Sequence, residues 1–272
     1  MDNILTYGFM QRALVAGIFI SIACAILGVF LVLKRDAMLG HGLSHVTFGG
    51  VALGLFFGVK PLLIALVVAV FCSVVIQKLR EKAGLYEDTA IGIFSSTGMA
   101  IGIILVTLSG KFNVDLFSYL FGNILAIERF EVVIAVLLAL AVIMVISFFY
   151  QELLYQTFDA ESARTSGIRI GFLDTVLAVL TSITVVIGMK VVGILLVAAL
   201  LVIPSAAGLQ IAKTFRQAVI ISSGVGIGSV IAGLFMAYYW DLPAAGTTVI
   251  VSFLVFLAFG TLRILRKRGV LE

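Results

Sequence analysis

Residues 13–33 read ALVAGIFISIACAILGVFLVL and contain no charged side chain. A helix rises about 1.5 Å per residue, so this run is about 30 Å long and matches the hydrocarbon core of a bilayer. The rest of the chain has the same character. Of its 272 residues, 62% are hydrophobic and 12% are charged, and the mean hydropathy is +1.25. A soluble domain carries about 25% charged residues. The composition therefore predicts an integral membrane protein.

The apolar runs are continuous and lack the alternation of a membrane barrel, which predicts an all-α polytopic bundle of about eight or nine transmembrane helices. Two spans have the least support from the sequence. The 41–59 span is rich in glycine, and the 191–211 span is separated from the preceding one only by Met189 and Lys190. A re-entrant piece within 110–129 is an alternative to a plain loop.

Glycines four apart predict close helix packing; they are Gly50–Gly54–Gly58, Gly98–Gly102 and Gly224–Gly228. The nine candidate spans are residues 13–33, 41–59, 61–77, 89–109, 130–149, 174–189, 191–211, 218–238 and 245–262.

The basic residues predict the orientation of the chain. If residues 13–33 end in the cytoplasm, thirteen of the 18 lysines and arginines lie inside. The positive-inside rule then places the N-terminus outside and the C-terminus inside. The longest polar connection, around 151–173, is cytoplasmic and too short to fold alone, so we expect one transmembrane domain over 1–272. No GxxxxGK[ST] loop occurs, so the chain has no visible nucleotide site, and the charge distribution indicates membrane orientation and no nucleic-acid partner.

The chain has two histidines, His41 and His45, in the stretch MLGHGLSHVTFGG of residues 38–50. Residues four apart share one face of a helix. Counted from Arg35, the two side chains lie about 9 and 15 Å into the bilayer. Ionisable groups at such depth are costly and mark a pathway by default. Two imidazoles on one face form half of a metal site, and they also suit a proton relay. The residues alone leave these two uses open.

Several blocks resemble the permease subunits of bacterial zinc, manganese and iron ABC importers. They are GVFLVLKRDAMLGHGLSHVTFGGVALGL at 28–55, FDAESARTSGI at 158–168 and VGILLVAALLVIPSAAGLQIA at 192–212. The family pattern is G-D-x-x-x-H, so its aspartate is His41 here and its histidine is His45. The resemblance implies that both side chains lie on the metal path. An imidazole in place of a hard oxygen donor should shift the preference from manganese toward zinc.

The resemblance also implies a mechanism and a set of partners. The chain would be no enzyme, would hold no permanent cofactor, and would pass a divalent metal ion, most readily zinc and next manganese or iron, across the bacterial inner membrane. A second permease subunit, expected to be another copy of this chain, would complete the path. A cytoplasmic ATPase dimer would supply the energy, and an extracytoplasmic metal-binding protein would deliver the ion. A proton-coupled secondary transporter that uses the histidines as a relay is the alternative.

Two further segments are assigned roles by this resemblance. Residues 158–168 would dock the ATPase through a short helix. Asp159 would be its N-cap and Gly167 would end it in a left-handed conformation, with Glu161 and Ala163 between them. Pro204 and Ser205 interrupt a span, and because proline removes a helical hydrogen bond they are candidates for a gate or hinge.

Overall fold

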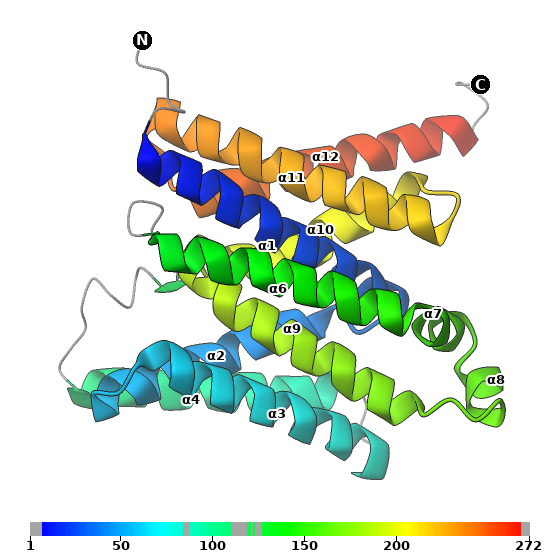
Figure 1. The fold of residues 1–272 in the computed structure, drawn as a ribbon, viewed down its shortest axis with the longest axis horizontal. Coiled ribbons are helices and arrows are strands. Elements are labelled where there is room, and N and C mark those ends of the chain that lie inside the picture. The colour runs from blue at the N-terminus through cyan, green and yellow to red at the C-terminus, as the bar shows by residue number, and fades with distance from the viewer. Residues whose placement is uncertain (1–6, 84–86, 110–118, 121, 123–126, 268–272) are drawn as a thin grey trace.

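The computed structural model describes residues 7–83, 87–109, 119–120, 122 and 127–267, and these residues contain helices and no strand. The predicted all-α architecture is confirmed, and the re-entrant piece within 110–129 lies largely outside the described residues. Figure 1 shows the long helices running side by side, with α11 and α12 at one edge of the bundle and α2, α3 and α4 at the other. The helices are α1 (Gly8–Leu33), α2 (Met38–Phe57), α3 (Pro61–Ala83), α4 (Glu87–Ser109), α6 (Arg129–Phe148), α7 (Tyr150–Phe158), α8 (Ala160–Thr165), α9 (Ile170–Val192), α10 (Ile194–Ile211), α11 (Phe215–Trp240) and α12 (Ala244–Lys267).

Within the described residues, eight helices are long and apolar enough to cross a membrane. The ninth long helix, α2, has 20 residues but is not among them. Its histidines and glycines lower the mean hydropathy of the segment. This is why the sequence supports a membrane span at 41–59 less clearly than elsewhere. In Figure 1, α1 begins at one end of the bundle and α12 ends at the other. This arrangement agrees with an odd number of crossings; which end is cytoplasmic stays a prediction.

Helix α1 forms the centre of the bundle. Two thirds of its most apolar stretch is buried (67%), compared with 11% for α12 and 17% for α4. It packs against α6, α9, α10 and α11. A helix that is apolar all round is suited to such a central position. The outer helices α4 and α12 leave most of their surface for lipid or for another subunit.

Small residues bring several helices together closely. A Cβ on Gly49 of α2 would lie 2.5 Å from the carbonyl oxygen of Gly98 in α4. Gly50 and Gly54 are packed as tightly against α3, as the spacing predicted. The expectation was wrong for Gly58, Gly224 and Gly228, because nothing lies within 4 Å of a Cβ at any of these positions. Gly58 is the left-handed residue that ends α2, and Gly224 and Gly228 are exposed on α11.

The boundary between α9 and α10 differs from the predicted one. Lys190 lies inside the last turn of α9, and the chain reverses at Gly193, whose φ of +89° and ψ of 152° suit only glycine. Lys190 is tolerated there because its ammonium forms an ion pair with Glu131 in the first turn of α6. The second helix therefore begins at Ile194, three residues later than expected.

Candidate functional site

The two histidines meet at their ring nitrogens. The Nε2 atoms of His41 and His45 are 3.2 Å apart. The ring centroids are 4.7 Å apart and the rings are nearly perpendicular, at 89°. The i, i+4 spacing on α2 thus does what helical geometry predicts. Without a metal, this contact is one hydrogen bond between a protonated nitrogen and an unprotonated one.

The pair lines a hollow of about 370 Å³ between α2 and α10. Ser44 is the other polar side chain on its α2 wall, and its hydroxyl donates to the carbonyl oxygen of Gly40 at 2.9 Å. Among the described residues that line this hollow, the imidazoles are therefore the side chains that offer nitrogen lone pairs, whereas the hydroxyl of Ser44 already uses its proton within α2. Its α10 wall is made by apolar side chains, including the small Ala198 and Ala199, and the members are Ile194, Leu195, Ala198, Ala199 and Val202.

The site is open on one side. His41 is exposed at the surface of the single chain and His45 is half-buried. Helix α2 starts at Met38, so His45 lies about 10 Å into a helix that is about 30 Å long, less deep than the count from Arg35 gave. Among the described residues, no group of three or more histidine, cysteine, aspartate or glutamate side chains could hold a metal ion. One chain therefore offers two nitrogen ligands at this position.

The predicted docking helix forms as α8, preceded by the further short helix α7. The carboxylate of Asp159 accepts a hydrogen bond from the backbone N–H of Ser162 at 2.9 Å, which is the predicted N-cap. The N–H of Gly167 donates to Arg164, and that of Ile168 donates to Ala163, each at 3.1 Å. These two bonds and the positive φ of Gly167 (+86°) make a Schellman motif.

The side chains of α8 divide into an anchored and a free set. Ala163 is fully buried, whereas Glu161 and Gly167 are exposed. Hydrogen bonds from the side chain and the backbone of Ser162 hold the pKa of the Asp159 carboxyl below its usual value. The N-cap is therefore ionised at neutral pH, and a charged cap also favours the positive end of the helix. In Figure 1, α7 and α8 lie together at one end of the bundle.

Comparisons with known proteins identify the family. The model of the ABC 3 transport family matches residues 6–262. The chain belongs to this family. It is 33% identical over 251 residues to the manganese import system permease protein ScaB of Streptococcus gordonii, covering 92% of this chain and 90% of ScaB. It is 33% identical over 244 residues to the high-affinity zinc uptake system membrane protein ZnuB of Haemophilus influenzae, covering 90% and 94%.

The fold is that of a solved family member. The structure of PsaBC from Streptococcus pneumoniae in complex with Fab matches with a TM-score of 0.84 and 31% identity, covering 95% of this chain and 93% of that one. The chain is thus a metal-ion ABC importer permease, a multi-pass protein of the bacterial inner membrane and not an enzyme, since the ATPase of this family is a separate subunit.

Pro204 and Ser205 lie away from the hollow of this permease. Helix α10 continues through the buried Pro204 without interruption, and the lining of the hollow ends at Val202. The hydroxyl of Ser205 donates to the carbonyl oxygen of Ala25 in α1 at 3.3 Å. The carbonyl oxygen of Ser205 accepts a bond from Ser222 in α11 at 3.5 Å. The Pro204–Ser205 step therefore lies where α1, α10 and α11 pack together.

Sequence reasoning missed the α10 wall of the hollow. Residues 194–202 are apolar throughout, so no periodicity indicates which side faces His45. Alanines at 198 and 199 are a weak signal, because small side chains leave room in a wall. Only the packing of α2 against α10 identifies them.

Proposed function

We propose that His41 and His45 bind the transported metal ion, and that this ion is zinc. The observation that supports the proposal is the 3.2 Å separation of the two Nε2 atoms. Two nitrogens at about 2.0–2.1 Å from a tetrahedral zinc ion lie about 3.3–3.4 Å apart. Both rings can therefore ligate one ion with a shift of a few tenths of an ångström, once both nitrogens are unprotonated.

The rest of the ligand set comes from a second permease subunit. A zinc ion takes four ligands, and one chain supplies two at this hollow. The exposed His41 gives a second reason. A polar ring on the outer surface of a membrane helix would face hydrocarbon, which is costly. A second copy of the chain, placed with its own α2 opposite, would cover both histidines and complete a four-imidazole site on the path.

The choice of zinc rests on the donor type. Imidazole nitrogens suit zinc, whereas manganese favours carboxylate, carbonyl and water oxygens. No carboxylate lines the hollow among the described residues. The names of the relatives include both metals, manganese more often than zinc, although ScaB and ZnuB have equal identity to this chain. The donor set is therefore the better guide.

A cytoplasmic ATPase dimer drives transport by docking on α8. The capped helix has a rigid start at Asp159 and a rigid end at Gly167, its inner side is fixed by Ala163, and Glu161 stands free for the partner. An extracytoplasmic metal-binding protein delivers the ion at the other end of the path. Pro204 leaves one backbone carbonyl of α10 without its helical donor. This makes α10 the wall of the hollow that bends most easily as the path opens and closes.

Uptake of zinc and manganese into proteoliposomes that contain the permease and its ATPase tests the proposal. His45→Ala should lose ATP-dependent zinc uptake. Ser44→Ala, which lines the same hollow, should keep it. Normal zinc uptake by His45→Ala would contradict the metal role of the pair. Uptake that needs a proton gradient and no ATP would instead support the proton-coupled alternative, which the family membership disfavours.

A further inference from the structure

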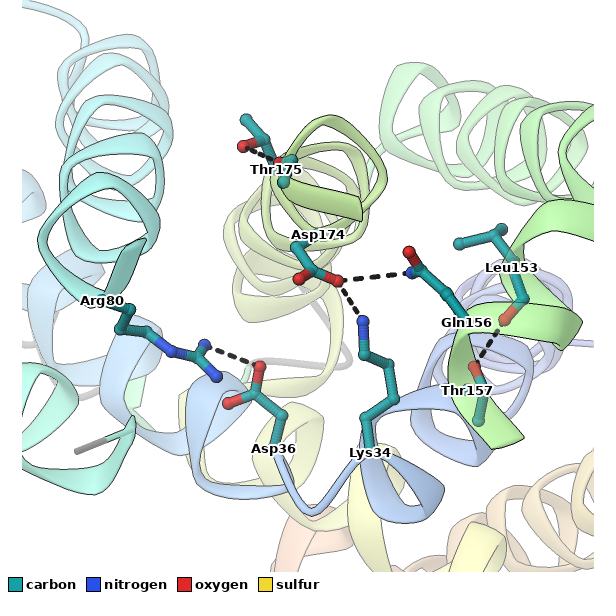
Figure 2. Close-up of polar contacts among 9 residues, drawn as sticks. Lys34, Asp36, Arg80, Leu153, Gln156, Thr157, Asp174 and Thr175 are labelled. Carbon is teal, nitrogen blue, oxygen red and sulfur yellow. Dashed lines mark hydrogen bonds and ion pairs between the residues drawn. The ribbon is translucent and has the colours of Figure 1, made fainter. Parts of the chain in front are cut away.

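An ion pair joins the end of α1 to the beginning of α9. Lys34 is the residue at which α1 ends, and its ammonium donates to Oδ1 of Asp174 in the second turn of α9. The side-chain amide of Gln156 in α7 donates to the same oxygen at 3.3 Å. Figure 2 shows Lys34 and Gln156 approaching Asp174 from two different helices. One carboxylate oxygen of α9 thus accepts hydrogen bonds from side chains of both α1 and α7.

A second ion pair holds the turn that follows. Nη1 of Arg80 in α3 donates to Oδ2 of Asp36 at 2.8 Å. The carbonyl oxygen of Asp36 accepts the N–H of Leu39 at 3.0 Å, in the first turn of α2. Between the two pairs, Arg35 adopts a left-handed conformation with φ of +62°. Such a backbone is unfavourable for a residue with a side chain, so the surrounding contacts must hold it in place.

These contacts are shielded from water. The side chains of Lys34 and Asp174 are 17% and 27% exposed, and those of Arg80 and Asp36 are 12% and 9% exposed. Gln156 is 3% exposed. Partly buried charges interact more strongly than surface charges, and breaking one partner leaves the other charge uncompensated. The turn is therefore held firmly, and a displacement of Asp174 is felt at Lys34.

The turn leads directly to the histidines. His41 lies one helical turn after the first residue of α2, Met38, and His45 lies one turn further. Helix α7, which carries Gln156, is anchored in the core because its Leu153 is fully buried. We therefore expect α7 to move together with the core against which it packs. Helix α8 in turn contacts both α7 and α9. A continuous set of contacts therefore runs from α8 through Gln156 and Asp174 to Lys34 and the start of α2.

We infer that Lys34, Asp174 and Gln156 are positioning residues that connect the ATPase-docking segment to the histidine pair. When α8 is pushed, the common carboxylate of Asp174 pulls on the α1–α2 turn and changes where α2 places His41 and His45 in the hollow. The inference rests on the proposed function, because it takes α8 as the docking helix and the pair as the metal ligands.

Transport and ATP hydrolysis, measured together in the same proteoliposomes, test this inference. Lys34→Met keeps most of the side-chain length and removes the charge, and Asp174→Asn keeps the shape. Each should lower the metal ions moved per ATP hydrolysed by about 5- to 150-fold, the usual range for a coupling between two sites. The rate of ATP hydrolysis should persist. Lys213→Met removes an exposed lysine and serves as the matched control with an unchanged ratio.

Two combined variants separate positioning from a general structural effect. Lys34→Asp with Asp174→Lys restores an ion pair of opposite polarity and should recover part of the ratio. Lys34→Met with Asp174→Asn should be no worse than either single variant, since residues that act through one another are not additive. If the single variants fail to reach the membrane, Gln156→Met, which keeps the ion pair, carries the test with a severalfold lower ratio.

The outcomes distinguish the inference from the function beneath it. Wild-type liposomes that move no metal would remove the proposed function itself. The inference alone would be overturned if the wild type transports metal and Lys34→Met and Asp174→Asn move as many metal ions per ATP hydrolysed as it does. If those two variants fail to reach the membrane, the same result for Gln156→Met would overturn it. Loss of zinc binding by the Lys34→Met permease, measured by equilibrium dialysis, would also overturn it, because a positioning residue leaves the two imidazoles able to bind.

Discussion

The packing of α1 against α10 at Gly28 gives a prediction whose size can be worked out from the structure. A Cβ added at Gly28 would lie 1.8 Å from the carbonyl oxygen of Leu201 and 2.4 Å from the hydroxyl of Ser205. Real Cβ atoms essentially never come closer than 3.0 Å to another heavy atom, so Gly28→Ala must separate the two helices by about 1.2 Å. The obstacle is backbone, which cannot rotate away. The substitution therefore moves the whole wall of the hollow.

The expected change in the free energy of unfolding for Gly28→Ala is the balance of two effects. Overpacking in a dense core costs about 1–3 kcal/mol, whereas alanine is about 1 kcal/mol better than glycine inside a helix. Gly224→Ala in α11 is the matched control, because it gains the helical preference and meets nothing within 4 Å. We expect Gly28→Ala to lie about 1–3 kcal/mol below Gly224→Ala in free energy of unfolding, because the helical gain is common to both and the overpacking cost alone remains.

Thermal unfolding of the purified permease in detergent measures this difference. At about 2–4 °C per kcal/mol for a chain of this size, Gly28→Ala should melt about 2–12 °C below Gly224→Ala. It should also lose zinc uptake, because α10 can no longer face His45 at the same distance. Equal melting temperatures for the two variants would refute the α1–α10 packing. Lower stability with full uptake would refute the link between that packing and the hollow.

Three further predictions follow from the site. His41→Asp replaces a nitrogen donor by oxygen and should shift competitive uptake from zinc toward manganese; an unchanged preference would remove the donor argument. Gly167→Pro cannot adopt the φ of +86° and loses the N–H that closes α8, so ATP-driven uptake should stop while the melting temperature stays that of the wild type. The pKa of Asp159 is lowered on folding, so its stabilisation of α8 is present above the unfolded value of about 3.9 and is lost as the pH falls through the folded one. The protection factors of the amides in residues 160–165, which compare their exchange rates with those of an unstructured chain at the same pH, should therefore hold at pH 5 and fall only at lower pH, and Asp159→Asn should abolish this acid transition.

Local signals in the sequence predicted the features that depend on a few neighbouring residues. The N-cap at Asp159 and the left-handed end at Gly167 need only the chain between them, and both formed as expected. The contact between His41 and His45 follows in the same way from the pitch of one helix. The all-helical membrane fold follows from continuous apolar runs, which in lipid can satisfy their backbone only as helices.

Features that depend on how helices pack were beyond the sequence. The glycine repeat at Gly224–Gly228 looks like the one at Gly98–Gly102, yet only the second is covered by another helix. The ion-pair partner of Lys34 is 140 residues away in the sequence. The sequence indicates a boundary between two spans at Lys190, because its ion pair with Glu131 cannot be predicted from local residues. The face of α10 that lines the hollow is as apolar as its other faces. In each case the deciding contact is long-range.

X-ray absorption at the zinc edge of the purified, zinc-loaded permease tests the central claim most directly, because it reports the ligands of the ion without requiring transport. The account predicts imidazole nitrogens at about 2.0–2.1 Å in a four-coordinate shell. It also predicts that this signal disappears in His45→Ala and persists in Ser44→Ala. A shell of oxygen or sulfur ligands, or an imidazole signal that survives in His45→Ala, would contradict the claim that this pair holds the transported ion.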